Sequence, residues 1–272
     1  MAEKKIACIV LPTFREAENI SALLPLIFAQ SDKIPTHDLH VLVVDDDSPD
    51  GTAERVRDAM ARYPNLHLFM GRRKGLGEAY KRGINHALIT LAPDLILQMD
   101  ADFQHDPAEL PRFIRLSTEG YSLVIGSRFV PGGALEDFPW YRRMISLAGT
   151  WLVCRFAGLV PIHDCTSGYR CIRADLLPRC DLAHLSTRGY SFQSSLLCEL
   201  LWNGARVAEI PITFAVRRNG KSKLSLRDQA EFLVNLVRLF LRRISRRALP
   251  PAPAPQASPG TDFASNPRRR TQ

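Results

Sequence analysis

The sequence predicts an α/β fold in which a mainly parallel β-sheet is covered by helices on both faces. Short runs rich in Val, Ile and Leu alternate with helix-like segments, and a polar or Gly/Pro turn follows each run. The 272 residues are 46% hydrophobic and 24% charged, which is enough for a sizeable core. Ligands of such sheets bind beyond the carboxyl ends of the strands, so the residues after each strand are the candidates for chemistry.

The first half of the chain contains five predicted strands and four predicted helices. The strands are 6–11, 40–45, 66–70, 95–99 and 122–126. The helices are 16–29, 52–63, 77–91 and 108–116. Because a helical segment separates each strand from the next, neighbouring strands are expected to run parallel.

The second half is less regular. Its predicted elements are a loop at 130–135, helices at 140–157 and 191–203, strands at 207–210 and 212–216, a basic loop at 217–223 and a last helix at 226–247. The segment 248–272 is rich in Pro, Ala and Ser, and we expect it to be disordered. The predicted organisation is therefore a body of residues 1–225, an amphipathic helix of residues 226–247 and a tail.

The net charge of +8 is concentrated at one end of the chain. Residues 238–272 hold eight basic residues and one acid, whereas residues 1–237 hold 28 basic and 27 acidic residues. A net positive charge favours an anionic partner, but a nearly neutral body argues against a body-wide nucleic-acid surface.

Cysteine usage and hydropathy both favour a reducing, cytoplasmic compartment. The six cysteines form no C-x-x-C pair and no metal-type spacing, so they are expected to be free thiols. The N-terminus has no signal-peptide pattern, and no apolar run reaches the ~18 to 20 residues that cross a bilayer. The nearest run, 144–162, is interrupted by Arg155.

Three successive carboxylates, Asp45, Asp46 and Asp47, end the second predicted strand. One interpretation is an ordinary turn in which Asp50 or Thr52 caps the next helix. The other is that a carboxylate at this edge accepts hydrogen bonds from a nucleobase or ribose.

A second acidic group follows the fourth predicted strand. Asp100 and Asp102 are two residues apart, so in an extended chain their side chains point the same way. With the amide oxygen of Gln104 they offer hard oxygen ligands that suit Mg²⁺ or Mn²⁺. A metal there would stabilise charge on a leaving diphosphate. The alternative is a solvated acidic turn before Pro107.

Basic side chains recur at the turns that follow the strands. They are Arg128, Arg142, Arg143, Arg217, Arg218, Lys221 and Lys223. Arginine binds phosphate oxygens bidentately, and these positions suit a shared phosphate site, although each alone is more often a solvated charge. The sequence contains no G-x-S-x-G, H-E-x-x-H or Walker A motif. His105 and His163 are expected to support the site or to lie on the surface.

Taken together, these motifs resemble the dolichyl- or polyprenyl-phosphate mannosyltransferases, which are inverting GT-A glycosyltransferases of family 2. The matching stretches are VDDDSPDGT (44–52), GLGEAY (75–80), MDADFQHDP (99–107), GSRFVPGG (126–133), DCTSGYR (164–170), GYSFQ (189–193) and EIPITFAVRRNGKSKLS (209–225). The resemblance implies a GT-A catalytic domain, with a Rossmann-like sheet, over residues 1–225.

The resemblance also implies roles for individual residues. The nucleotide-binding set is Pro12, Phe14, Glu16, Val44, Asp46, Asp100 and Ala101. The metal and diphosphate site is Asp100, Asp102 and Gln104. The catalytic set that holds the donor diphosphate and the lipid phosphate is Asp102, Arg128, Arg142, Ser146, Arg217 and Lys223.

The implied reaction transfers mannose from GDP-mannose to a polyprenyl phosphate, with Mg²⁺ or Mn²⁺, and yields the β-linked mannosyl phospholipid and GDP. A sugar hydroxyl acceptor needs a general base, whereas a phosphate monoester with a second pKa of ~6 is already largely dianionic at pH 7. A UDP-sugar donor and a non-catalytic nucleotide-sugar or anionic-lipid binding module remain as alternatives. A separate membrane-protein partner also remains open.

The chain departs from the family pattern at three places. Ser195 replaces the acid that usually follows the FQ motif, and Glu199, one turn later, is a candidate to take over that role. The small polar residues expected after Ser146 are altered at 147–150. The C-terminal membrane-spanning helices of many relatives are absent from this sequence.

The last predicted helix carries an apolar stripe beside arginines at four-residue steps. The stripe is Phe232, Leu233, Leu236, Val237, Phe240, Leu241 and Ile244, and the arginines are Arg238, Arg242 and Arg246. A basic amphipathic helix lies on an anionic bilayer, which favours a peripheral protein on the cytoplasmic membrane face. The alternative is a helix packed on the body with a solvated arginine face.

Overall fold

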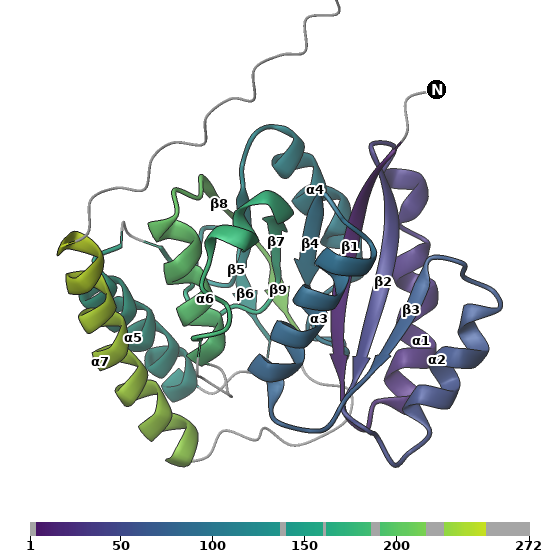
Figure 1. Cartoon of the computed structure of the whole chain (residues 1–272), viewed down its shortest axis with the longest axis horizontal. Coiled ribbons are helices and arrows are strands. Elements are labelled where there is room, and N and C mark those ends of the chain that lie inside the picture. Colours follow the sequence, from purple (N-terminus) through teal and green to yellow (C-terminus); the bar gives the residue numbers. More distant parts are fainter. Residues whose placement is uncertain (1–3, 137–139, 160–161, 186–190, 216–225, 249–272) are drawn as a thin grey trace, which may run out of the picture.

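The computed structural model describes residues 4–136, 140–159, 162–185, 191–215 and 226–248, and its centre is a seven-stranded sheet (Figure 1). The strand order is β3-β2-β1-β4-β7-β5-β8. Its strands are β1 (Lys5–Thr13), β2 (His37–Asp45), β3 (Leu66–Met70), β4 (Leu95–Gln98), β5 (Leu123–Ser127), β7 (Arg170–Arg173) and β8 (Val207–Pro211). A small second sheet pairs β6 (Ala134–Leu135) with β9 (Thr213–Phe214). The predicted α/β class with a mainly parallel sheet is confirmed.

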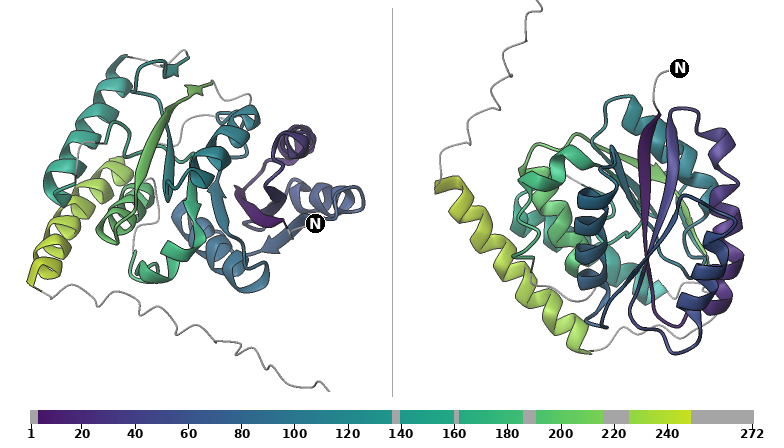
Figure 2. Two further views of the ribbon diagram at one scale, coloured as in Figure 1. Left: turned by 90° about the horizontal axis from the view of Figure 1, so that it is seen from above. Right: turned by 45° about the vertical axis from the view of Figure 1, so that its right-hand side comes forward.

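Helices cover both faces of the sheet, as Figure 2 shows from two further directions. They are α1 (Ala17–Phe28), α2 (Thr52–Met60), α3 (Leu76–Thr90), α4 (Leu110–Thr118), α5 (Trp140–Ala157), α6 (Ser191–Trp202) and α7 (Leu226–Ala248). Three short 3₁₀ turns span Ser31–Lys33, Pro107–Glu109 and Ala174–Arg179. One hydrophobic core joins the sheet to α3, α5, α6 and α7, and the other joins it to α1, α2 and α4.

β1 explains why the first half of the sequence could be interpreted so directly. Ala7, Ile9 and Leu11 face one core, Cys8 and Val10 face the other, and all five are fully buried. A strand that is covered on both faces has a continuous apolar run, and that run is the pattern the sequence presents.

The strand β7 was not predicted, and it is antiparallel to both of its neighbours, β4 and β5. Its first residue, Arg170, is fully buried. The guanidinium of Arg170 donates to the carbonyl oxygens of Gln193 (2.6 Å) and Cys165 (2.9 Å). An arginine inside a four-residue strand hides the apolar pattern, so this segment had no recognisable strand signal.

The last helix, α7, packs beside α5 and α6 through an inner face that holds both apolar and polar side chains. Leu239 and Asn235 are 3% exposed, and Asn235 accepts a hydrogen bond from Ser195 Oγ (2.9 Å). Further along the same side, Arg242 and Arg246 contact the carboxylate of Glu199 at 3.1 and 2.8 Å. α7 is therefore held to the body by apolar packing and by ion pairs with a buried acid.

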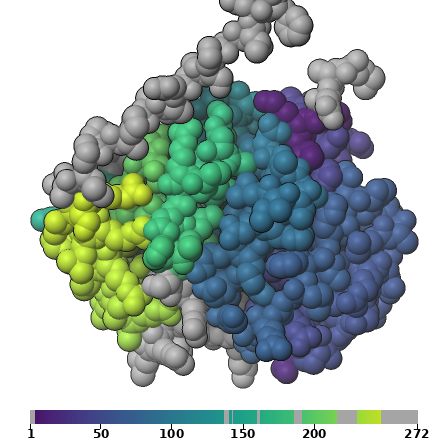
Figure 3. Space-filling view, in the orientation of Figure 1, coloured from purple at the N-terminus to yellow at the C-terminus, as the bar shows by residue number. Residues whose placement is uncertain are grey.

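The outer side of this layer is apolar, and α7 forms a ridge along one edge of the molecule in Figure 3. The exposed apolar residues of α7 are Leu233, Val234, Val237, Phe240, Leu241 and Ile244. Those of α5 are Trp140, Tyr141, Met144, Ile145 and Trp151. Both simple interpretations of this helix were incomplete, because Arg242 and Arg246 pair with an acid of the body. Leu236 of the predicted stripe is buried, whereas most of that stripe is exposed.

Within the described residues, no helix combines the length and hydropathy needed to cross a membrane. The predicted disordered tail, 248–272, lies outside the described residues apart from Ala248, the last residue of α7.

Candidate active site

The carboxyl ends of β1 and β2 are joined by a buried acid. Asp45 is fully buried, and its Oδ1 accepts hydrogen bonds from the hydroxyls of Thr13 (2.8 Å) and Ser48 (2.7 Å). Its neighbour Asp46 forms an ion pair with Arg82 of α3. Burial raises the pKa of Asp46, although the Arg82 pair acts in the opposite direction. Of the three successive carboxylates, one fixes the turn, one pairs with an arginine and one, Asp47, is exposed.

The loop after β1 is fastened to the start of α2. Asp50 accepts hydrogen bonds from the backbone N–H groups of Ala17 (3.1 Å) and Thr52 (3.2 Å). Thr52 Oγ1 in turn accepts the N–H of Glu16 (3.0 Å). The N-cap of α2 is Gly51, in the left-handed region at φ 84°, and neither Asp50 nor Thr52 occupies that position. The capping interpretation was therefore wrong in position, and these polar groups cross-link two loops.

The residues implied in nucleotide binding lie along this edge. Phe14 follows β1, and the guanidinium of Arg73 lies 3.9 Å from its ring centroid, in cation–π contact. Pro12 and Val44 are paired in register on adjacent strands. The Val44 side chain is fully buried against α3, so this residue offers a ligand its backbone alone.

The second acidic group follows β4. Tyr80 donates its hydroxyl to Asp100 Oδ1 (2.9 Å), and Asp102 Oδ1 accepts the backbone N–H of Gln104 (3.2 Å). The amide of Gln104 donates to the carbonyl of Ala215 (3.3 Å), which follows β9. Burial and the charges of Asp100 and Asp102 raise the pKa of Tyr80 well above its ordinary value.

The donor set of this acidic loop fits a hard divalent cation. Mg²⁺ is usually bound by one or two carboxylates, completed by substrate phosphates and water. Among the described residues no group of three or more His, Cys, Asp or Glu side chains is placed to hold a metal ion by itself. Asp100 and Asp102, with Gln104 beside them, match a cation that is shared with a diphosphate.

Further residues pack against this loop and support it. His105 is 1% exposed, its Nδ1 accepts the N–H of Asp100 (3.0 Å), and its ring stacks on Tyr169 at 4.7 Å. Burial lowers the pKa of His105 to about 4, so the ring is neutral at pH 7. Gly168 also lies close to this loop, because a Cβ at this position would lie 3.4 Å from Gln193 Nε2 and 3.8 Å from Asp100 Oδ2. His105 thus supports the acidic loop, as one of its two predicted roles required. The exposed His163 instead pairs with Glu209 (2.8 Å).

Three non-glycine residues at the same edge have positive φ values. Arg15, Asp47 and Phe103 have φ values of 62°, 58° and 65°, and they follow β1, β2 and β4. Non-glycine residues rarely adopt this left-handed region, and strained residues cluster at ligand sites. The loop after β1 and the two loops that carry the acids are therefore held in specific, costly conformations.

Arg128, at the end of β5, is more deeply engaged than the sequence indicated. Its Nε and Nη2 donate to the two carboxylate oxygens of Asp164, both at 2.7 Å, and Nη2 also donates to Thr166 (2.6 Å). Burial alone would raise the pKa of Asp164, but the charge and hydrogen bonds of Arg128 hold it below its ordinary value. A Cβ at Gly133 would lie 2.7 Å from the Ser127 carbonyl oxygen, so only glycine allows the chain to fold back over this arginine.

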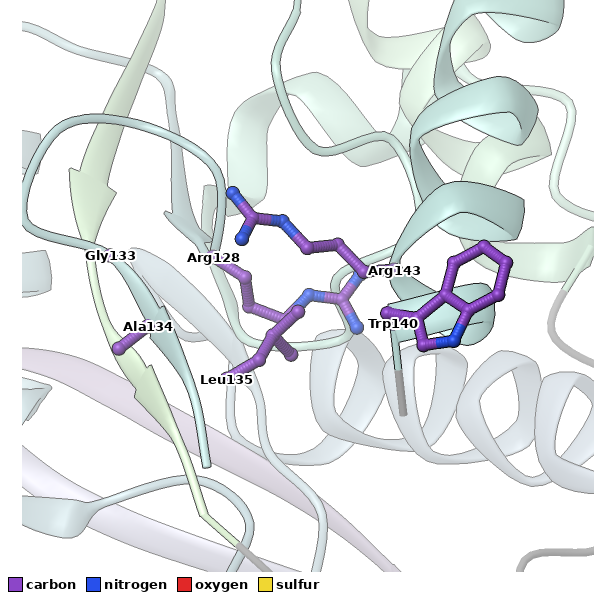
Figure 4. Close-up of a pocket in the computed structure, with 6 residues that line it drawn as sticks. All are labelled: Arg128, Gly133, Ala134, Leu135, Trp140 and Arg143. Atoms are coloured by element: carbon purple, nitrogen blue, oxygen red, sulfur yellow. The ribbon is translucent and has the colours of Figure 1, made fainter. Parts of the chain in front are cut away.

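A small pocket of about 210 Å³ opens beside Arg128 (Figure 4). Arg143 and Trp140, from the start of α5, line it together with the backbone turn at Gly133. Arg142 and Ser146 also belong to α5, and Ser146 is half-buried. Two guanidinium groups beside one pocket suit a phosphate ligand.

Two predictions concern residues that the structure assigns elsewhere or does not describe. Glu199 is 1% exposed and paired with Arg242 and Arg246, so it holds α7 and does not stand in for a site acid. Ser195, at the family's acidic position, also contacts α7. Arg217 and Lys223 lie outside the described residues, as do Arg218 and Lys221.

The sequence matches known proteins along most of its length. Residues 8–180 match the model of the family described as "Glycosyl transferase family 2". The chain is 40% identical over 220 residues to the polyprenol monophosphomannose synthase of Mycolicibacterium smegmatis, covering 80% of each protein. It is 40% identical over 231 residues to the undecaprenyl-phosphate mannosyltransferase of Micrococcus luteus, covering 84% of this chain and 91% of that protein.

Solved structures share the fold. The mannosyl-3-phosphoglycerate synthase of Rubrobacter xylanophilus superimposes with a TM-score of 0.64 at 21% identity, covering 94% of this chain and 79% of that one. A glucosyl-3-phosphoglycerate synthase of Mycobacterium tuberculosis, in complex with Mn²⁺ and UDP-glucose, gives a TM-score of 0.61 at 20% identity, covering 89% and 79%. These likenesses confirm the GT-A architecture.

Proposed function

The chain belongs to glycosyl transferase family 2 and is a glycosyltransferase, and from this premise we propose that it transfers mannose from GDP-mannose to a polyprenyl phosphate. The proposal rests mainly on two features at one edge of the sheet. One is an acidic loop suited to a metal diphosphate, and the other is an arginine pocket suited to a second phosphate. The names and 40% identities of the two relatives support the mannose and polyprenyl assignments.

The donor nucleotide is proposed to bind along the ends of β1, β2 and β4. Phe14 and Arg73 offer stacking surfaces for a base, and the Asp46–Arg82 pair lies at the adjacent strand end. Asp100 and Asp102 would hold Mg²⁺ or Mn²⁺, which when bound neutralises charge on the diphosphate leaving group. His105 and Tyr80 hold the loop that presents these carboxylates.

The acceptor phosphate is proposed to bind in the pocket of Arg128 and Arg143. Arg142, Ser146, Arg217 and Lys223 are the further residues that we propose for phosphate binding. A phosphate monoester is already mostly dianionic at neutral pH, so the protein must position it and has no proton to remove. One acceptor oxygen forms a bond to the anomeric carbon as the bond from that carbon to the GDP oxygen breaks. A single displacement of this kind inverts the configuration, giving the β-linked product and GDP.

Access to a lipid acceptor gives the outer helical layer a role. The exposed apolar side chains of α5 and α7 are proposed to rest on the cytoplasmic membrane surface, because an isoprenoid acceptor is reached only from the bilayer. The inward pairing of Arg242 and Arg246 leaves this contact mainly apolar. Residues 1–225 would then form the catalytic domain, with 226–247 as a membrane-contacting helix.

The test is incubation of the purified chain and Mg²⁺ with a short polyprenyl phosphate and labelled GDP-mannose or UDP-glucose. We expect a β-mannosyl phospholipid from GDP-mannose and loss of product when the metal is chelated. Product from UDP-glucose alone would replace the proposed donor. Nucleotide binding without product from any donor would favour the non-catalytic module.

A matched pair of variants tests the acceptor pocket. Arg143→Gln should raise KM for the lipid phosphate about tenfold or more while leaving KM for the donor unchanged, because it removes one charge-assisted contact. The control, Arg115→Gln, removes an equally exposed arginine from α4 and should change neither constant. A rise in the donor KM alone would place the acceptor elsewhere.

A further inference from the structure

Two cysteines meet beside the site. Cys154 of α5 and Cys165, which follows Asp164, have their sulfur atoms 3.7 Å apart in thiol–thiol contact. Cys154 is half-buried, whereas Cys165 is buried. A disulfide has an S–S distance of about 2.05 Å, so bond formation requires the two sulfurs to approach by roughly 1.7 Å.

The surroundings of Cys154 give a reagent access and favour the thiolate. Cys154 lines an open groove of about 650 Å³, together with the apolar Phe129, Leu147 and Trp151 and the basic Arg155 and Arg243. The thiolate is the attacking form of a cysteine, so a lowered thiol pKa favours reaction. The hydrogen bond with Cys165 also lowers the pKa of Cys154, to about 6.

The environments of the other four cysteines are different. Cys8, Cys171, Cys180 and Cys198 are buried, and burial raises the pKa of each thiol to about 12 or above. The pKa of the buried Cys165 is raised as well, by its hydrogen bond with Cys154 and by burial. Buried neutral thiols are inert, so Cys154 is the one of the six thiols that is placed to attack a reagent first.

Cys165 is linked through its neighbour to Arg128, the arginine proposed to bind phosphate. Its neighbour Asp164 holds the Arg128 guanidinium by two hydrogen bonds of 2.7 Å. Its carbonyl accepts from Arg170 (2.9 Å), and its N–H donates to Thr150 (3.2 Å). A displacement of Cys165 toward Cys154 would therefore be transmitted to Asp164 and Arg128.

We propose that Cys154 and Cys165 form a thiol–disulfide exchange site for low-molecular-weight disulfides, and that closure of this disulfide slows the enzyme by displacing Arg128. The Cys154 thiolate attacks one sulfur of the reagent disulfide, whose S–S bond breaks and releases one thiolate. Cys165 then loses its proton to that thiolate and attacks the Cys154 sulfur, expelling the second reagent thiolate. This thiolate takes up from water the proton that Cys154 gave to water when it ionised, so the two hydrogens lost by the protein are balanced by the two released thiols.

The covalent step is tested with oxidised glutathione and peptide mass analysis. Trypsin places Cys154 in peptide 144–155 and Cys165 in peptide 156–170, so the disulfide links two separate peptides under non-reducing conditions. We expect the linked pair in the wild type, a glutathione adduct on peptide 144–155 in Cys165→Ser, and no change of either peptide in Cys154→Ser. The control Cys198→Ser keeps the link. A wild type that retains glutathione on Cys154 without the link would overturn the exchange site.

The effect on activity rests on the proposed function and is measured separately. The linked chain should lose roughly 10- to 100-fold in kcat/KM for the lipid phosphate, because a displacement of about 1 Å at a site can cost that much. Reductant should restore the rate, and the Cys154→Ser enzyme should not respond to the reagent. A linked chain with full activity would refute the coupling to Arg128. Absence of activity in every form would count against the proposed function and leave the peptide result valid.

Discussion

Charged side chains are usually exposed and large apolar side chains are usually buried. The loops at the carboxyl end of the sheet depart from the first rule, and the outer helical layer departs from the second. In the loops, Asp164 and Arg128 form a buried ion pair, and the buried Asp46 pairs with the half-buried Arg82 of α3. In the layer formed by α5 and α7, large apolar groups are exposed, with Trp140 at 78% and Trp151 at 65%. Buried charge and exposed apolar surface both cost stability and usually mark sites of function. The contrast agrees with the proposal that one region binds anions and that the other contacts an apolar surface.

The largest effect is expected from breaking the buried pair. Asp164→Asn should destabilise the chain by about 3–5 kcal/mol, because it leaves the Arg128 guanidinium buried without a counter-charge. Urea unfolding measures the loss. The matched control is Asp175→Asn, which breaks the exposed pair with Arg173 (2.8 Å) and should cost less than about 1 kcal/mol. Equal losses would mean that the site pair is no more important than a surface pair.

A loss of catalysis without a loss of fold is expected at the acidic loop. Asp102→Asn should lower kcat by roughly 10²–10³, the usual cost of one removed electrostatic contact to a leaving group. Its Mn²⁺ affinity, followed by electron paramagnetic resonance, should fall as well. Asp106→Asn makes the same chemical change in the same loop, where the side chain caps a 3₁₀ turn through Ala108 N–H (2.9 Å), and should leave both readouts unchanged. Full activity of the Asp102 variant would remove the metal assignment.

The outer layer is tested by placing a charge on its apolar face. Leu241→Asp should weaken binding to anionic liposomes about tenfold or more, because a buried leucine contributes about 1.5–3 kcal/mol. Leu241 is 56% exposed, so the fold should be retained. Ile89→Asp, at an 84% exposed site on α3, is the control and should bind as the wild type does. Unchanged liposome binding by the Leu241 variant would show that the exposed stripe is not the membrane contact.

The smallest effect concerns acid stability in the part of the sheet remote from α5 and α7. His40 and His67 share a hydrogen bond of 3.0 Å between β2 and β3, and burial lowers the pKa of both. The unfolded chain therefore binds protons first as the pH falls below ~6.5, and stability declines toward acid. The decline should be less than about 1 kcal/mol, because both rings remain in part exposed to water. His67→Gln should reduce this decline in urea titrations between pH 7 and 5, and an unaltered slope would exclude the pair as its cause.

The elements covered on both faces were predictable from the sequence, and those that depend on distant partners were not. β1 to β5 and their helices follow the apolar pattern to within a few residues, whereas β7 was hidden by the buried Arg170. The positions of the acids at strand ends follow from the parallel topology alone. Their partners do not, because Asp164 lies 36 residues from Arg128 in sequence.

The orientation of α7 gives the same lesson on a larger scale. Helical periodicity predicted an apolar stripe beside Arg238, Arg242 and Arg246, but periodicity alone leaves open which side meets the body. Glu199, a buried acid on α6, pairs with two of these arginines and so turns that side of α7 toward the body. An ion pair between helices has no signature within either helix.

The central position of β7 also constrains the order in which the chain can be assembled. β4 and β5 are not hydrogen-bonded to one another. Both pair with residues 170–173, which are synthesised well after them. Until those residues leave the ribosome, β4 has an unpaired edge and β5 has no paired neighbour, because β8 follows later still. Pairing over such sequence distances is slow and exposes the edges to aggregation. A nascent chain halted before Arg170 should therefore depend on chaperones, and one extended beyond β8 should not.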